Sequence, residues 1–319
     1  MLDLSRESVR SELKEVMETW KNAGAGGFQL RDLGLAYLGF GVESDPMEML
    51  KIVSGWLNGS SILIADIGNA DEIKRDAKKI YTSGADMVFG YTLKVFNRGV
   101  DEWNTETKNE VKGNIKEVTE LIEACPAGTR LEVPLRLSDF TTQLYGVDIK
   151  FDYLYNNLLV LAFTLPGTPY IVSGEELMQV GNLPQSLNWT LVNQCDLEDK
   201  KQNSECSTLK LVKKLSKMRK DGAITPTDPL EFIDVLPEHE EKNGILIFDR
   251  GLNMVIVNLS YQDINLDCPT LQDHVLDKKR YIVFSTPGSS YEIDKEVTCE
   301  YLPKLKRAEG VILSLSSTA

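Results

Sequence analysis

Histidine is scarce in this chain, and its scarcity excludes several kinds of catalytic site. The 319 residues include two histidines, His239 and His274, and both lie beyond residue 222. The preceding part of the chain therefore has no imidazole for a Ser-His-Asp site or for an H-E-x-x-H zinc site. No C-x-x-C pair occurs either, so the five cysteines do not indicate a zinc or thioredoxin-like site.

Basic residues are also in deficit. The chain has 35 Lys and Arg against 48 Asp and Glu, which gives a formal net charge of -13. Binding to the phosphates of nucleic acids requires clustered positive charge, and the basic runs here are short and interrupted by apolar residues. We therefore expect no nucleic-acid partner.

Long hydrophobic runs are absent from the sequence. No run reaches the ~18 apolar residues that indicate a transmembrane helix, and the longest, 158–165, ends at Pro166. The opening MLDLSRESVR lacks the basic-then-apolar order of a signal peptide. These absences favour a soluble cytosolic protein, but two other features favour an extracellular one.

The first of these features is a set of three N-x-[ST] sequons. They place candidate glycosylation sites at Asn58, Asn188 and Asn258. The second feature is the pattern of cysteines. Cys195 and Cys206 bracket the polar segment CDLEDKKQNSEC, and Cys268 and Cys299 lie in a strand-rich region. We take these four cysteines as disulfide candidates, whereas Cys125 is expected to be a small buried apolar residue.

Strands and helices alternate along the first two thirds of the chain. Apolar residues at helical spacing predict an amphipathic helix over 6–22, with Ser5 as its N-cap and Gly24 after its end. A second helix is predicted over 45–57, and strands are predicted near residues 28, 63, 88, 132 and 171. This order is typical of parallel strands joined by crossover helices.

Beyond about residue 222 the pattern changes. Short β-rich runs are separated by Gly, Pro and Asn, and DRGLN (249–253) between two apolar runs predicts a hairpin. We therefore expect two domains, an α/β domain over 1–222 and a small antiparallel β domain over 223–319.

Two segments resemble the α-amylase family, glycoside hydrolase family 13. LPGTPYIVSGEEL (165–177) resembles the segment that closes the barrel in that family, and VRSELKEVMETWKNAGAGGFQL (9–30) resembles the helix and strand that lead into its G-F-R-x-D motif. The resemblance implies a partial (β/α)8 TIM-type barrel, strands 4 to 8, followed by an antiparallel β-sandwich.

The same resemblance places the positions of the catalytic residues. The nucleophile position is occupied by Arg31, and Asp32 beside it points to the opposite face of the strand. The general-acid position falls near Ile67, with Asp66 adjacent, and Asp139 is a loose counterpart of the third carboxylate. Retaining glycosidases need two converging carboxyl groups, so this alignment implies that the chain is no enzyme and needs no cofactor or metal.

The form GFQLRD and the ending YLPKLKRAEGVILSLSS (301–317) are similar to the heavy-chain subunits of heteromeric amino-acid transporters, the solute carrier 3 family. That resemblance implies a non-catalytic ectodomain on the extracellular side of the plasma membrane, part of a type II membrane glycoprotein. Its partner would be a multi-span light chain whose trafficking and stability it assists. The sequons and disulfide candidates fit such a protein, since ectodomains fold in an oxidising compartment.

The family match begins in the middle of the barrel. We therefore expect a fragment without the N-terminal part of the family, including the segment that enters the membrane. Five of eight strands cannot close a barrel, and open strand edges expose unpaired backbone groups. The chain alone is accordingly expected to be poorly soluble or to assemble through these edges.

Two alternative functions are left open. One is an α-glucosidase-type hydrolase whose acids align differently, and the other is a catalytically inactive sugar-binding barrel. The adjacent acids Glu175 and Glu176 are expected to be structural, because neighbouring residues point apart. The run AGAGG precedes a strand, which is the wrong order for a Rossmann phosphate loop.

Overall fold

The structure is a computed structural model of the whole chain. It describes residues 6–31, 46–66, 79–80, 82–89, 108–109, 112–113, 115–116, 119–120, 134–136, 152–171, 173–178, 186–197, 204–233, 244–260, 262–266, 278–298 and 304–316. The chain divides into two compact units, which are described separately. Unit 1 comprises Met1–Thr92 and Lys116–Pro134, and unit 2 comprises Leu93–Ile115 and Leu135–Ala319.

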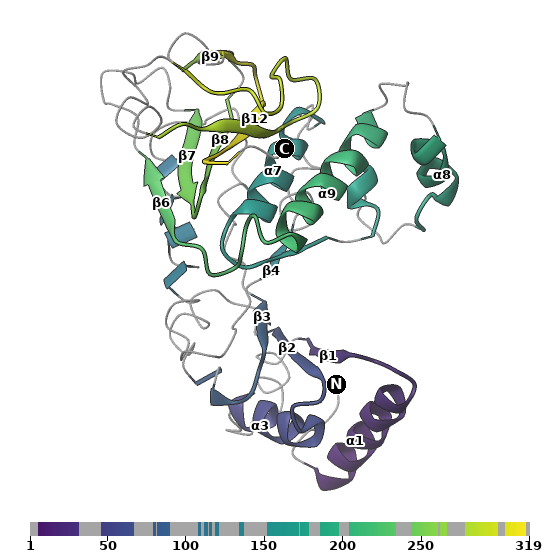
Figure 1. The fold of residues 1–319 in the computed structure, drawn as a ribbon. Coiled ribbons are helices and arrows are strands. Elements are labelled where there is room, and N and C mark those ends of the chain that lie inside the picture. The colour runs from purple at the N-terminus through teal and green to yellow at the C-terminus, as the bar shows by residue number, and fades with distance from the viewer. Residues whose placement is uncertain are drawn as a thin grey trace. The chain divides into compact units, whose positions relative to one another are not determined.

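Unit 1 contains a parallel sheet in the order β1-β2-β3, formed by β1 (Gly27–Leu30), β2 (Ile62–Asp66) and β3 (Met87–Phe89). Helices α1 (Glu7–Asn22) and α3 (Pro46–Leu57) pack against one face of this sheet (Figure 1). The core between them includes Met17 of α1, Leu50 and Val53 of α3, and Leu63 and Ala65 of β2. The three strands predicted near 28, 63 and 88 are therefore confirmed.

Helix α1 confirms the amphipathic segment, with two differences. Its N-cap is Arg6, which makes no capping side-chain hydrogen bond, so the expected cap at Ser5 is wrong by one residue. The helix ends as expected at a left-handed glycine, Gly24 (φ 101°). Of the apolar stripe, Met17 is buried, whereas Val16 is 52 % exposed and Trp20 is 61 % exposed.

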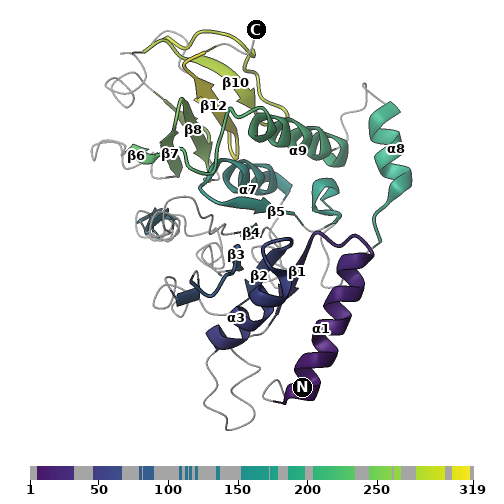
Figure 2. The same cartoon turned by 60° about the horizontal axis from the view of Figure 1, so that its bottom comes forward.

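Unit 2 contains the helices α7 (Asp152–Thr164), α8 (Trp189–Leu197) and α9 (Ser204–Lys220). Strand β4 (Pro134–Arg136), which begins at the boundary of the units, pairs with β5 (Thr168–Tyr170), and the short 3-10 helix η4 (Glu175–Leu177) follows. Figure 2 shows β5 beside α7. The two remaining predicted strands are confirmed, but α8 was not predicted, because it is only nine residues long and its apolar residues show little helical periodicity.

The late part of unit 2 forms a five-stranded antiparallel sheet in the order β10-β12-β8-β7-β6. Its strands are β6 (Leu230–Ile233), β7 (Ile245–Arg250), β8 (Asn253–Asn258), β10 (Tyr281–Ser285) and β12 (Gly310–Ser314). Strands β9 (Ile264–Asn265) and β11 (Lys304–Leu305) form a separate antiparallel pair. The predicted hairpin is confirmed: Gly251 (φ 60°) and Leu252 make the turn between β7 and β8.

Both faces of this sheet are covered. Val255 and Val257 of β8 pack in one core with residues of α7 and α9, while Met254 and Ile256 of the same strand pack in a second core with β9 and β11. Every residue of β8 is therefore buried, which explains its continuous apolar run. The division at residues 222 and 223 stays a prediction.

Candidate functional site at the carboxyl edge of the parallel sheet

The carboxyl edge of the sheet in unit 1 carries two charged residues. Arg31 directly follows β1, and Asp66 is the last residue of β2. The strands pair in the register Gln29 with Ile64 and Leu30 with Ala65, so Arg31 and Asp66 are the next residues along adjacent parallel strands. In barrels built of parallel strands, catalytic groups come from this edge.

The alternation of side chains shows which face these residues occupy. Leu30, Leu63 and Ala65 pack toward the helices in the core of unit 1. Successive side chains of a strand point to opposite faces, so Ile64 and Asp66 lie on the face away from α1 and α3. The same alternation places Gln29 and Arg31 there, and we call this the helix-free face because no helix of the described residues packs on it. Arg31 is exposed, whereas Asp66 is only 3 % exposed. A buried carboxyl group thus lies in the last residue of β2, and an exposed guanidinium group lies in the residue after the neighbouring strand β1.

The sequence alignment had assigned the acid position to Ile67, with Asp66 only adjacent. Ile67 lies outside the described residues, as do Asp32 and Asp139. The burial of Leu63 and Ala65 shows that Asp66 is in phase with the helix-free face. All four residues of ILIA (62–65) are apolar, so the phase of β2 is seen only in their burial and not in the sequence.

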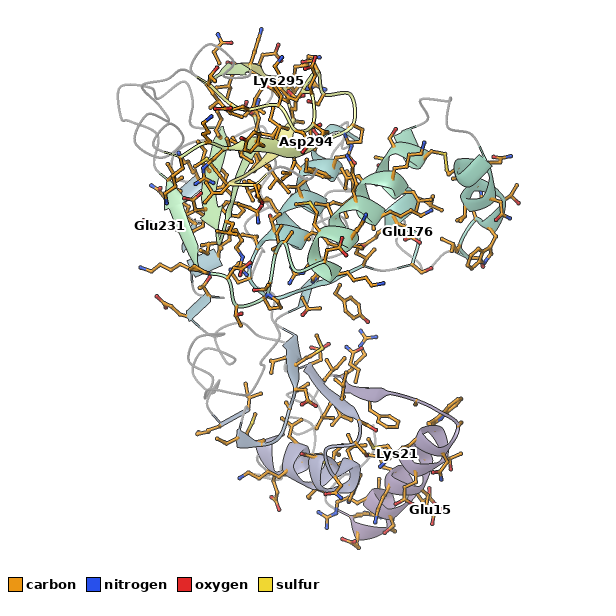
Figure 3. All side chains as sticks on the ribbon, in the orientation of Figure 1. Glu15, Lys21, Glu176, Glu231, Asp294 and Lys295 are labelled. Atoms are coloured by element: carbon orange, nitrogen blue, oxygen red, sulfur yellow. A yellow bond between two sulfur atoms is a disulfide. The ribbon has the colours of Figure 1, made fainter. Side chains whose placement is uncertain are left out.

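The acidic pair in unit 2 has a local role. The side-chain Oε2 of Glu176 accepts a hydrogen bond from the backbone N–H of Gly174 at 2.8 Å, and Gly174 has a left-handed φ of 102°. The hydroxyl of Tyr155 in α7 donates to the backbone carbonyl of Glu175 at 2.6 Å. Glu175 is buried and Glu176 is half-buried beside α9 (Figure 3). These contacts fix the turn after β5.

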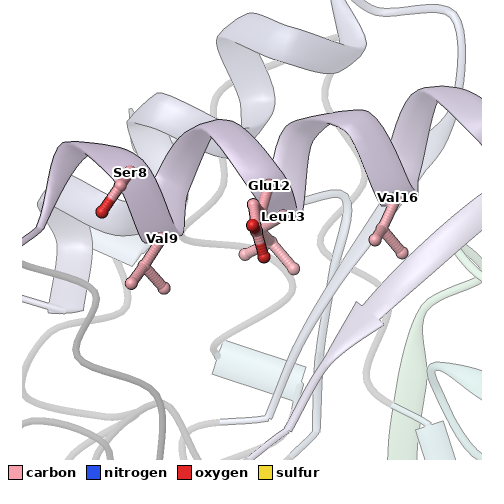
Figure 4. Close-up of a pocket in the computed structure, with 5 residues that line it drawn as sticks. All are labelled: Ser8, Val9, Glu12, Leu13 and Val16. Atoms are coloured by element: carbon pink, nitrogen blue, oxygen red, sulfur yellow. The ribbon is translucent and has the colours of Figure 1, made fainter.

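A shallow groove of about 260 Å³ lies along α1 (Figure 4). Ser8, Val9, Glu12, Leu13 and Val16 line it, and all five belong to one helix. This lining is mostly apolar and includes one carboxylate, Glu12. The groove thus offers no pair of carboxyl groups.

No metal site is found in the part of the chain that the structure describes, since no three His, Cys, Asp or Glu side chains gather there. Within the same part, none of the helices has the length and apolar character needed to cross a membrane.

One disulfide candidate pair is confirmed. Cys195 in α8 is bonded to Cys206 in α9, with 5.0 Å between their Cα atoms. Both cysteines are buried in a small core with Leu177 and Leu209. Cys268 and Cys299 lie outside the described residues.

The three sequon asparagines differ in environment. Asn58 lies in a left-handed turn after α3 (φ 50°) and is exposed. Asn188 is also exposed, and its Oδ1 accepts a hydrogen bond from the backbone N–H of Leu191 in the first turn of α8. Asn258, at the end of β8, is completely buried.

Comparisons with solved structures identify proteins of similar fold. The α-amylase from H. orenii has a TM-score of 0.69 at 14 % identity, and the match covers 98 % of this chain and 65 % of that one. The Geobacillus thermoleovorans α-amylase, complexed with acarbose, has a TM-score of 0.64 at 14 % identity, covering 100 % and 66 %. Isomaltulose synthase from Klebsiella sp. LX3 has a TM-score of 0.64 at 12 % identity, covering 98 % and 69 %.

The chain therefore spans about 65 % of the length of the first of these proteins. No protein-family model matches the chain, and no curated protein matches it.

The structural matches correct one expectation from the sequence. The chain was expected to be no enzyme, because Arg31 occupies the nucleophile position and Ile67 lies near the acid position. That expectation is contradicted, since the similar structures are those of two α-amylases and an isomaltulose synthase, which are enzymes. The assignments of Arg31 to the nucleophile position and of Ile67 to the acid position stay predictions, and Asp66 is the last residue of β2, directly before Ile67. The comparisons and the parallel sheet together show an α/β, amylase-like fold.

Proposed function

We propose that this chain is part of an α-glucosidase-type glycoside hydrolase and that Asp66 serves as its acid–base group. The amylase-like fold supports a sugar substrate with an α-glycosidic bond, as in the α-amylases that it resembles. The observation that carries the proposal is the buried carboxyl group of Asp66 at the carboxyl edge of the parallel sheet.

The chemistry of glycoside cleavage gives Asp66 a defined task. The leaving oxygen of the sugar needs a proton as the glycosidic bond breaks, and a positioned carboxylic acid supplies it. Burial on the helix-free face keeps bulk water away from such an acid, while its place at a strand end holds its backbone rigid. We further assign the five early strands, β1 to β5, to strands 4 to 8 of an eight-stranded barrel.

Hydrolysis of a chromogenic α-glucoside by the full chain tests this function. We expect Asp66→Asn to lower kcat/KM by about 100-fold or more, because general acid catalysis contributes ~10²–10⁴-fold. Asp86→Asn is the matched control. Asp86 lies just before β3, at the opposite edge of the same sheet, and its carboxylate accepts a hydrogen bond from the backbone N–H of Leu63 at 2.8 Å.

We expect Asp86→Asn to retain activity within about twofold, because the amide oxygen of asparagine can still accept that bond. The proposal is wrong if the wild-type chain shows no turnover, or if the two variants lose activity equally.

A second function is favoured by a different set of residues. Arg31 occupies the position at which the family resemblance expects a nucleophile, and the Cys195–Cys206 disulfide is typical of proteins that fold in an oxidising compartment. These features support a heavy chain of a heteromeric amino-acid transporter, on the extracellular side of the plasma membrane, that assists the trafficking of a multi-span light chain. Co-precipitation of the protein with a multi-span protein, through a link that reductant releases, would support this function.

A further inference from the structure

The Asn258 sequon differs from the other two in the way its side-chain amide is used. The amide Nδ2 of Asn258 donates to the carbonyl oxygen of Gln262 at 2.8 Å, of Lys306 at 3.0 Å and of Leu305 at 3.4 Å. Its Oδ1 accepts hydrogen bonds from the backbone N–H of Ser260 at 3.0 Å and from the Ser260 hydroxyl at 2.7 Å. One buried side chain therefore joins the end of β8 to the following loop and to β11.

N-glycosylation uses the same atom. The Nδ2 atom attacks the anomeric carbon of an oligosaccharide carried on a lipid diphosphate. The bond from that carbon to the diphosphate oxygen breaks, the lipid diphosphate leaves with the electron pair, and Nδ2 loses one proton. The product retains one N–H at Nδ2 and has a sugar ring attached to it.

Asn258 cannot accommodate this product in the folded chain. Its side chain is 0 % exposed, so a sugar on Nδ2 would displace the strands around it. The reaction would also remove one of the two N–H groups that serve three carbonyl oxygens. Buried carbonyl groups that lose their donors are costly.

Asn188 presents the opposite case. It is exposed, and the atom that caps α8 is its Oδ1. Glycosylation at Nδ2 leaves Oδ1 in place, so the modified residue still caps the helix. Asn58, in its exposed left-handed turn, is likewise open to the surface.

We propose that Asn258 is a structural tether and not a glycan acceptor, and that Asn58 and Asn188 carry the N-linked oligosaccharide of the folded chain. The assignment rests on the fold around each sequon and not on the proposed hydrolytic activity.

The full chain, secreted from a eukaryotic cell behind an added leader, gives the direct test. Enzymatic release of N-glycans in H₂¹⁸O converts each glycosylated asparagine to a labelled aspartate, which peptide mass spectrometry locates. We expect label at Asn58 and Asn188 and none at Asn258 in the soluble, folded fraction. Label at Asn258, or no label at either exposed site, would overturn the assignment.

The same substitution at two sequons separates tether from acceptor. Asn188→Asp should remove one glycan and change the Tm by no more than about 2 °C, because aspartate is also a good N-cap. Asn258→Asp should leave the glycan mass unchanged and lower the Tm by roughly 5–10 °C, because a carboxylate donates nothing to the three carbonyls. An unchanged Tm for Asn258→Asp would refute the tether.

A third variant covers the case in which Asn258→Asp does not fold. Ser260→Ala abolishes the sequon and keeps the tethering amide. We expect Ser260→Ala to leave the glycan mass unchanged, whereas Thr190→Ala removes one glycan. A loss of one glycan from Ser260→Ala would show that Asn258 is an acceptor.

Discussion

Arg250 shows how a single buried cation joins separate parts of unit 2. Its Nε donates to the carbonyl of Thr164 at the end of α7 at 3.0 Å, and its Nη2 donates to the carbonyls of Thr225 and Pro226 at 2.8 and 2.9 Å. Burial lowers the pKa of Arg250 to about 10, with partial compensation from Asp228. The residue therefore connects α7, the segment before β6 and strand β7.

Replacing Arg250 removes all three contacts. We expect Arg250→Met to lower the free energy of unfolding by about 2–5 kcal/mol, because three backbone carbonyl groups lose a charged donor and a buried acceptor left without a partner costs ~1–3 kcal/mol. Lys279→Met is the control, because its ion pair with Glu296 is exposed and worth at most ~1 kcal/mol. Urea unfolding followed by circular dichroism measures the free energy of unfolding of both variants. Equal losses in Arg250→Met and Lys279→Met would contradict the role of Arg250 as a buried link.

The pH dependence of that loss has a definite sign. The folded pKa of Arg250 is about 10, below the usual value of an arginine, so the unfolded chain binds the proton more tightly. Stability therefore rises with pH only between these two values. Near neutral pH both states are protonated, and the difference between Arg250→Met and the wild type should be the same at pH 6 and pH 8.

Asp66 shows which part of the candidate site could be read from the sequence. Strand β2 was predicted correctly, whereas the predicted acid position, Ile67, lies outside the described residues. The phase of a strand follows from which residues face the helices, and Leu63 and Ala65 provide that information. The burial of Asp66 could not have been predicted, because it depends on packing between elements.

At the scale of elements, the disulfide fixes α8 against α9. Cys195 and Cys206 are 11 residues apart and close the loop between the two helices. Residues 189–197 were not predicted to be helical. Their stability depends on contacts such as Leu191 and Val192 against Leu177 and Leu209, since a nine-residue helix is marginal alone.

Loss of the disulfide should destabilise this pair of helices. We expect the double variant Cys195→Ser/Cys206→Ser to lower the free energy of unfolding by about 2–3 kcal/mol, from the entropy of the opened loop. Hydrogen exchange should show faster exchange of the amides of α8 in the variant. Added reductant should produce the same increase in the wild type and no further increase in the variant. Equal exchange in the oxidised and reduced wild type would contradict a stabilising role.

At the scale of the whole molecule, each unit has its own core. In unit 1, α1 and α3 bury one face of the parallel sheet. Strand β1 lies at the edge of that sheet and, among the described strands, pairs with β2 alone. Val16 and Trp20 of α1 are also exposed. Unpaired strand edges and exposed apolar side chains both promote association.

We expect the chain to self-associate with rising concentration. Light scattering coupled to size-exclusion chromatography should show a mass above 35.7 kDa for the wild type. The double variant Val16→Lys/Trp20→Lys should reduce that mass, because charges at those positions oppose apolar contact. Glu15→Lys, on the same helix (Figure 3), is the control for added positive charge. A monodisperse wild-type monomer at all concentrations would refute the prediction.

The sequence by itself determined the local elements of this protein. Periodic apolar residues specified α1 and the five early strands, Gly24 specified the end of α1, and Gly251 specified the β7–β8 hairpin. Each of these elements depends on neighbours within a few residues. The tertiary structure alone decided which side chains are buried. Asn258 and Asn188 both begin an N-x-[ST] sequon, yet Asn258 lies buried among β8, the loop that follows it and β11. Burial depends on contacts between distant segments, so a motif cannot specify it.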